Sequence, residues 1–170
     1  DGGPGEEDAI PISVDFAALQ SVNEDIAAWI FCEGTDINYP VVQGEDNDFY
    51  LGHTYDKAVS RSGSIFVEAL NAPGFEDSNT IIYGHHMKNG SMFATLRNWS
   101  DQAYYEEHPM FWLLTPGQDY QVLLFSGYTT AATSDAYTVF RGPCREFDDY
   151  LQAALAESDF SADVEIDPAG

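Results

Sequence analysis

The chain has 170 residues, of which 44% are hydrophobic, so it is long enough to form one domain around a hydrophobic core. Six Lys and Arg residues stand against 29 Asp and Glu residues, which gives a formal net charge of −23. Nucleic acids and anionic membrane surfaces are recognised through basic patches, so this charge argues against both as partners. No apolar run approaches the roughly 20 residues of a membrane-spanning helix.

The first predicted helix lies within residues 13–28. Phe16, Leu19, Val22 and Ile26 recur at helical spacing, and Asn23 is expected to restart a short second helix. Residues 1–12 are polar and rich in turn residues, so we expect a linker or an expression remnant there. The domain is accordingly assigned to residues 13–170.

From Trp29 onward the pattern becomes that of short strands separated by glycine and proline. Seven strands are predicted, at residues 29–32, 39–43, 64–67, 80–83, 110–115, 121–128 and 137–140. Short strands at this spacing favour a closed barrel or a sandwich. A helix with one apolar face is predicted over residues 147–156, and a short extended piece over residues 164–166.

Residues 79–96 carry the clearest sign of chemistry. An apolar strand runs into Gly84 and delivers His85 and His86 at its end, and Ser91 is expected to cap a short helix after the turn. A histidine on a rigid strand end, with a glycine beside it, is well placed for proton transfer. A purely structural role is the alternative for either histidine.

The order of several such segments resembles that of class B sortases, the cysteine transpeptidases that attach surface proteins to the Gram-positive cell wall. The segments that carry this resemblance are residues 23–30, 34–43, 46–51, 62–66 and 79–96. The resemblance implies a mainly β fold: a sortase-like closed β-barrel with N-terminal helices and an inserted helix near its C-terminal end. It also implies an extracellular protein whose membrane contact is a missing N-terminal anchor.

In this family a cysteine thiolate cleaves a sorting signal and a histidine protonates the leaving amine. A cationic side chain stabilises the oxyanion, and the acyl group then passes to a peptidoglycan amine. By resemblance the catalytic histidine is His85, because His86 is expected to point to the opposite face of an extended segment. The cysteine and arginine motifs are missing from the sequence, so the domain is expected to be C-terminally incomplete and the chain alone inactive.

Cys144 is an alternative nucleophile, because Arg141 and Arg145 flank it and a helix is predicted to begin nearby. It nevertheless precedes the inserted helix. The other cysteine, Cys32, lies in a predicted strand as a small buried residue, and a Cys32–Cys144 disulfide stays open.

A second group of residues is expected to line the substrate groove. By resemblance Leu51 lies in the groove, and Tyr128, Thr129 and Thr130 are expected to form another wall; ordinary core or strand-end packing is the alternative for Leu51 and Tyr128. The histidine and carboxylate spacings match no metal site, so neither a metal nor another cofactor is expected.

The predicted partners are the sorting-signal peptide of surface proteins and a peptidoglycan precursor amine, at the outer face of the plasma membrane or in the cell wall. Two other functions remain open at this point. One is a sortase-like module that binds a peptide without cutting it. The other is a pilin-polymerising sortase, which would use a lysine as the acceptor.

Overall fold

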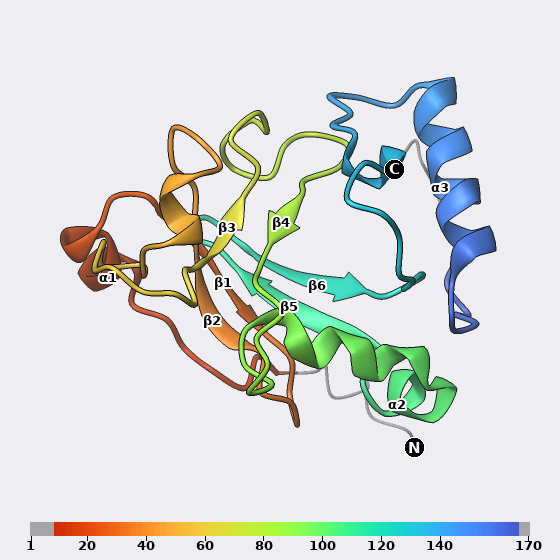
Figure 1. Ribbon diagram of the computed structural model, residues 1–170, viewed down its shortest axis with the longest axis horizontal. Coiled ribbons are helices and arrows are strands. Elements are labelled where there is room, and N and C mark those ends of the chain that lie inside the picture. Colours follow the sequence, from red (N-terminus) through yellow and green to blue (C-terminus); the bar gives the residue numbers. More distant parts are fainter. Residues whose placement is uncertain (1–8, 167–170) are drawn as a thin grey trace, which may run out of the picture.

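A curled six-stranded sheet forms the body of the molecule, described here by a computed structural model for residues 9–166 (Figure 1). Its strands are β1 (Ile26–Phe31), β2 (Asn38–Val42), β3 (Ile65–Val67), β4 (Ile82–Tyr83), β5 (Met110–Leu114) and β6 (Asp119–Leu123). They lie in the order β4-β3-β2-β1-β5-β6, so β4 and β6 form the two edges. Only β2 and β3 pair in parallel within this sheet. The predicted mainly β fold is confirmed.

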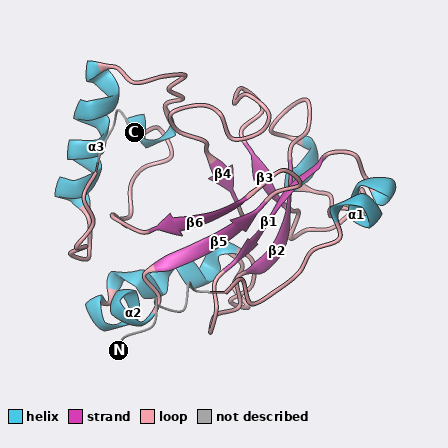
Figure 2. Cartoon of the chain, turned by 180° about the vertical axis from the view of Figure 1, so that it is seen from behind, coloured by secondary structure: helices cyan, strands magenta, loops and turns pink. Residues whose placement is uncertain are grey.

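The helices are α1 (Phe16–Val22), α2 (Gln102–Glu107) and α3 (Arg145–Glu157), with 3-10 segments η1 (Phe49–Leu51), η2 (Phe93–Ser100) and η3 (Asp135–Tyr137). Seen from behind, α1 and α3 lie at opposite ends of the molecule, and α2 covers one end of the sheet (Figure 2). Across residues 9–166 the helices are too short or too polar to cross a bilayer.

Hydrophobic side chains pack on both faces of the sheet. The larger cluster includes Ile30, Val41, Ile65 and Val67, and residues of η2 and α2 cover it. The smaller cluster lies on the opposite face and comprises Ile26, Val42, Tyr50 and Phe66, with Phe16, Leu19 and Tyr83 packed against it. Because alternate residues of a strand face opposite sides, neighbouring residues of β3 contribute to different clusters. The part of the sheet formed by β2 and β3 is therefore covered on both faces, whereas β6 is mostly exposed.

The first predicted helix is shorter than its apolar spacing suggested, and the second short helix does not form. Helix α1 ends at Val22, and Ile26 instead pairs with Val42 as the first residue of β1. Asn23 is buried at this junction and donates hydrogen bonds to the Tyr50 hydroxyl and the Tyr55 carbonyl, both at 2.7 Å. These long-range bonds stop the helix, because they fix Asn23 in an extended conformation.

The segment after β4 also differs from the prediction. Ser91 caps no helix; its hydroxyl donates to Oδ1 of Asn89 at 2.6 Å. The following helix is a 3-10 segment that begins after Met92, whose φ of 57° makes the sharp bend. Helix α2 was not predicted, because its polar sequence has little periodicity; Asp101 caps it by accepting from the backbone N–H of Ala103 at 2.9 Å.

Beyond β5, two predicted strands are wrong in extent or type. The strand expected over residues 121–128 ends at Leu123, and residues 137–140 form no strand. The helix predicted over residues 147–156 is confirmed, with wider bounds, as α3. Residues 164–166 have no regular secondary structure. The long connection between β6 and α3 therefore consists mainly of irregular backbone.

Candidate active site

Strand β4 presents the candidate histidine through a glycine that has no room for a side chain. A Cβ atom on Gly84 would lie 2.5 Å from Cδ1 of Ile65 and 2.6 Å from Cδ2 of Phe93. Both distances are far below normal contact, so only glycine fits where η2 packs against the backbone. Gly84 thus faces the larger cluster, whereas Tyr83 packs against the smaller one. If the extended backbone continues past β4, alternation puts His85 on the same side as Tyr83.

His85 combines a fixed backbone with a side-chain nitrogen that has no partner. Its carbonyl oxygen accepts a hydrogen bond from the N–H of Phe93 at 2.9 Å, which ties the strand end to η2. Its Nε2 atom is buried and has no hydrogen-bond partner among residues 9–166. A buried polar atom without a partner costs about 1–3 kcal/mol, and a catalytic role is one reason for a folded protein to retain such an atom. His85 is therefore the leading candidate for proton transfer.

His86 differs from His85 in its surroundings. It is exposed and forms an isolated antiparallel bridge with Met92. The two histidines thus differ in burial, and the expectation that they face opposite sides stays a prediction.

A hydrogen-bonded chain connects the strand before His85 to the loop before η1. The Tyr83 hydroxyl donates to one carboxylate oxygen of Glu68 at 2.8 Å, and the Asn47 amide donates to the other at 2.7 Å. Burial, followed by the Glu68 hydrogen bond, raises the pKa of Tyr83 to about 12, so the hydroxyl remains a donor at neutral pH. This chain of hydrogen bonds was not predicted from the sequence, although a glutamate directly after the buried β3 is unusual and indicates a polar partner.

Glu68 predicts a pH dependence of stability. Burial opposes its ionisation, but hydrogen bonds from Asn47, Tyr83 and the backbone outweigh burial and hold its pKa below the ordinary value of 4.5. A lowered folded-state pKa stabilises the fold above the unfolded pKa, and that stabilisation is lost as the pH falls through the folded value. We expect Glu68→Gln to reduce the free energy of unfolding at neutral pH and to match wild type well below pH 4.5.

Denaturant titrations across this pH range measure the difference directly. Glu107→Gln, which removes an exposed carboxylate of α2, is the matched control and should show little effect throughout. A Glu68→Gln deficit that persists unchanged at the acid end would contradict this assignment.

The predicted groove residues lie in different environments. Leu51 ends η1 and is exposed, next to Tyr50 in the smaller cluster that also contacts Tyr83. Tyr128 is half-buried, whereas Thr129 and Thr130 are exposed in the connection between β6 and α3. Their lining of a groove stays a prediction.

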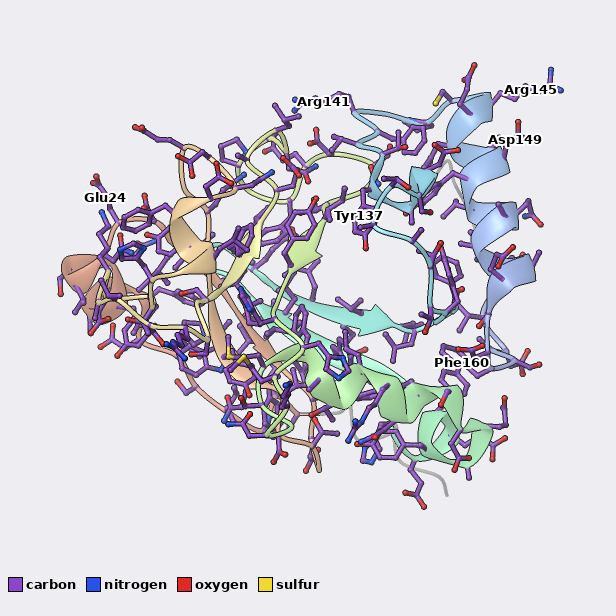
Figure 3. All side chains as sticks on the ribbon, viewed as in Figure 1. Glu24, Tyr137, Arg141, Arg145, Asp149 and Phe160 are labelled. Atoms are coloured by element: carbon purple, nitrogen blue, oxygen red, sulfur yellow. The ribbon has the colours of Figure 1, made fainter. Side chains whose placement is uncertain are left out.

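Tyr137, at the end of η3, is a neighbour of β4 that the sequence did not predict. Its ring stacks on that of Tyr83 with centroids 6.1 Å apart and planes at 17°. Figure 3 shows Tyr137 between β4 and α3. The connection that holds Tyr128 thus reaches β4 through this aromatic pair.

Neither cysteine of the described chain is brought to His85. Cys32 is buried in the larger cluster, and its thiol contacts the Met110 carbonyl at 3.5 Å. Cys144 is exposed directly before α3, whose first residue, Arg145, lies far from the end of β4 that leads to His85 (Figure 3). Both cysteines are free, so the Cys32–Cys144 disulfide is not formed.

Thiol labelling should separate the two cysteines. Burial raises the pKa of Cys32, and its side chain is only 1% exposed, so both access and thiolate formation are suppressed. We expect a maleimide to add once to this folded chain, at Cys144, and twice after unfolding. Peptide mapping by mass spectrometry identifies the site, and Cys144→Ser should abolish native labelling. Rapid native modification of Cys32 would contradict its burial and show that the chain opens at the end of β1.

Comparison with known proteins gives a consistent result. No family model matches the sequence. The chain is 40% identical over 150 residues to sortase B of Listeria monocytogenes and 35% identical over 153 residues to sortase B of Staphylococcus aureus. These matches cover 87% and 89% of this chain, and 60% and 62% of the relatives. The chain therefore spans about three fifths of the length of these curated relatives.

Solved structures agree in fold and extend the coverage. A Staphylococcus aureus sortase B–substrate complex superposes with a TM-score of 0.86 at 31% identity, covering 90% of this chain and 71% of that chain. A sortase B complexed with Gly3 gives a TM-score of 0.85 at 32% identity over 90% and 72% of the two chains. Sortase B from Listeria monocytogenes gives 0.80 at 39% identity, covering 91% of this chain and 88% of that chain. The chain belongs to the sortase B family.

Proposed function

We propose that this chain carries the histidine half of a cysteine transpeptidase active site. The protein would cleave a sorting signal of surface proteins and join the released acyl group to a cell-wall amine. The observation that carries this proposal is the buried, unpartnered Nε2 of His85 at the end of the edge strand β4. Membership of the sortase B family supports the same reaction class.

The chemistry assigns a proton-transfer role to His85. A thiolate attacks the scissile carbonyl, and the carbon–nitrogen bond breaks as His85 gives a proton to the departing amine, leaving a thioester. An acceptor amine then attacks the thioester and gives one proton to His85, so that a new amide forms and both the thiolate and the protonated histidine are regenerated. We place the thiolate on a strand that pairs with the edge of β4, because such a strand would lie next to His85 and would cover the unpaired backbone groups of that edge.

The proposed partners are a sorting peptide of the Asn-Pro type and a peptidoglycan precursor amine. A sortase B has been solved with substrate, and another structure holds Gly3, which supports a peptide donor and an amine acceptor for this protein. Leu51, Tyr128, Thr129 and Thr130 are proposed to contact the peptide. These partners occur at the cell wall, so the proposed location is the outer face of the plasma membrane of a Gram-positive bacterium.

The reaction is tested with the full-length protein and a quenched fluorescent library of Asn-Pro pentapeptides. We expect cleavage, and with added triglycine we expect a new peptide–glycine product in mass spectrometry. Formation of a lysine-linked product only would identify a pilin-polymerising enzyme instead. Saturable peptide binding with neither cleavage nor transfer would contradict the transpeptidase and favour a binding module.

A further inference from the structure

The connection between β6 and α3 is attached to the β3–β4 connection by two groups of polar contacts, one made by Asn79 and the other by Arg141. Most of residues 128–143 are exposed and irregular, so their own sequence does not fix their path. Ordering one residue costs about 1–2 kcal/mol of backbone entropy, and contacts made elsewhere must offset that cost. The position of this connection is therefore set by a few identifiable side chains.

Asn79 makes three hydrogen bonds to the backbone of this connection. Its side-chain amide donates to the Thr138 carbonyl at 2.6 Å, and its Oδ1 accepts from the N–H of Phe140 at 2.5 Å. Its own backbone N–H donates to the Phe140 carbonyl at 3.3 Å. The side chain thereby replaces the strand pairing that the sequence led us to expect at residues 137–140.

Arg141 makes the second attachment one residue further along. Its guanidinium pairs with Asp77 at 3.3 Å and donates to the Leu70 carbonyl at 2.5 Å (Figure 3). Asp77 is itself held by the side-chain amide of Asn71 and the N–H of Ala72, both at 2.8 Å. The arginine is thus attached to a preformed loop.

Asn71 connects the two attachments, because its side chain binds both Asp77 and Asn79. It is buried with 3% exposure, and its amide also donates to the Asn79 carbonyl at 2.8 Å. Its Oδ1 accepts from the N–H of Ile81, directly before β4, at 3.0 Å. The attached connection is therefore fixed relative to the strand that leads to His85.

We propose that Asn79 is a positioning residue of the His85 site. It holds the connection after η3 beside β4, so that Tyr137 stays stacked on Tyr83, two residues before His85, and forms one wall of the peptide site. This assignment deepens the proposed function and rests on it for the peptide. The unit made by Asn79, Arg141, Asp77 and Asn71 is called the clasp below.

Tyr137 is the residue through which the clasp would affect peptide binding. Tyr137 is 44% exposed although its ring stacks on Tyr83, so it offers an apolar surface next to Tyr83, two residues before His85. From the other side, the Tyr150 hydroxyl of α3 donates to the Ala136 carbonyl at 3.0 Å. Loss of the clasp would leave η3 attached to α3 and held against β4 by the Tyr137–Tyr83 stack alone.

Hydrogen exchange and peptide binding together test the clasp. We expect Asn79→Ala to speed hydrogen exchange of the Phe140 amide about tenfold, because the loss of one hydrogen bond favours local opening by about that factor. The exchange rates of the β5 amides should not change. In the full-length protein we expect KM for the Asn-Pro peptide library to rise about tenfold. Because Asn79 does not touch the reacting atoms, kcat should change by no more than about twofold to threefold.

Two further variants separate positioning from general damage. Asn79→Asp keeps the acceptor for Phe140 but sets an oxygen against the Thr138 carbonyl, so it should loosen the connection while preserving the size of the side chain. Arg141→Gln should raise KM, whereas Arg145→Gln, at an exposed arginine outside the clasp, should not.

Each combined result decides the assignment. Faster exchange with a higher KM and retained kcat supports it. Unchanged exchange, or faster exchange with unchanged KM, overturns it. A wild-type protein that neither binds nor cleaves the peptides overturns the proposed function, and the positioning role of Asn79 falls with it even where exchange shows that the contact itself exists.

Discussion

Replacement of His85 by alanine in the full-length protein is expected to lower kcat/KM for sorting-peptide cleavage about 10³-fold. A positioned general acid contributes about 10²–10⁴ to the rate, and the adjacent His86 is exposed rather than buried. The structure supports this expectation because His85 has its backbone fixed by Phe93 and its Nε2 buried without a partner among residues 9–166. Steady-state kinetics with a quenched fluorescent peptide measure the effect.

His86→Ala is the matched control for this experiment. The two histidines are adjacent, but His86 is exposed, so its removal should change kcat/KM by no more than about twofold to threefold. Circular dichroism should show that both variants stay folded. Retention of activity in His85→Ala, or its loss in His86→Ala alone, would reverse the assignment of the two residues.

Gly84→Ala is expected to lower the free energy of unfolding by about 1–3 kcal/mol, the cost of forcing a methyl group into a packed core. The new Cβ would lie 2.5 Å from Ile65 and 2.6 Å from Phe93, so either η2 or the strand end must move. Because His85 follows directly, the same displacement should reduce cleavage in the full-length protein. Urea denaturation and peptide kinetics measure the two losses.

Gly117→Ala is the control for Gly84→Ala, and Phe93→Leu is the substitution expected to compensate for it. Gly117→Ala should change stability by less than about 0.5 kcal/mol, because a Cβ there meets no atom within 4 Å. Adding Phe93→Leu to Gly84→Ala removes the ring from the clash and should restore part of the activity. A Gly84→Ala protein as stable and active as wild type would show that the packing around β4 is looser than described.

The sequence predicted those parts of the fold that depend on local pattern. Residues 64–67 and 110–115 were expected as strands because they are short apolar runs bounded by turn residues, and β3 and β5 lie there. Ile26 was misplaced because its spacing continues that of α1. Its pairing with Val42 depends on Asn23 and Tyr50, which lie 27 residues apart. Tertiary hydrogen bonds therefore overrode the helical pattern.

In the candidate site, too, the sequence predicted the residue that depends on local pattern and not the residues that depend on distant contacts. His85 was predicted because a strand, a glycine and a histidine are adjacent in sequence, and its family resemblance is carried by the same segment. Its neighbours Glu68 and Tyr137 were missed, since each reaches Tyr83 from a distant part of the chain. Asn79 likewise bonds to residues about 60 positions away, which no local pattern reveals.

The most direct test of the central claim is the intact mass of the full-length protein after brief incubation with a sorting peptide and acid quenching. We predict a covalent adduct equal in mass to the acyl half of the peptide, in wild type and His86→Ala but not in His85→Ala. Peptide mapping should place this thioester on a cysteine other than Cys32 and Cys144. Absence of the adduct from wild type, or its equal formation in His85→Ala, would contradict the account.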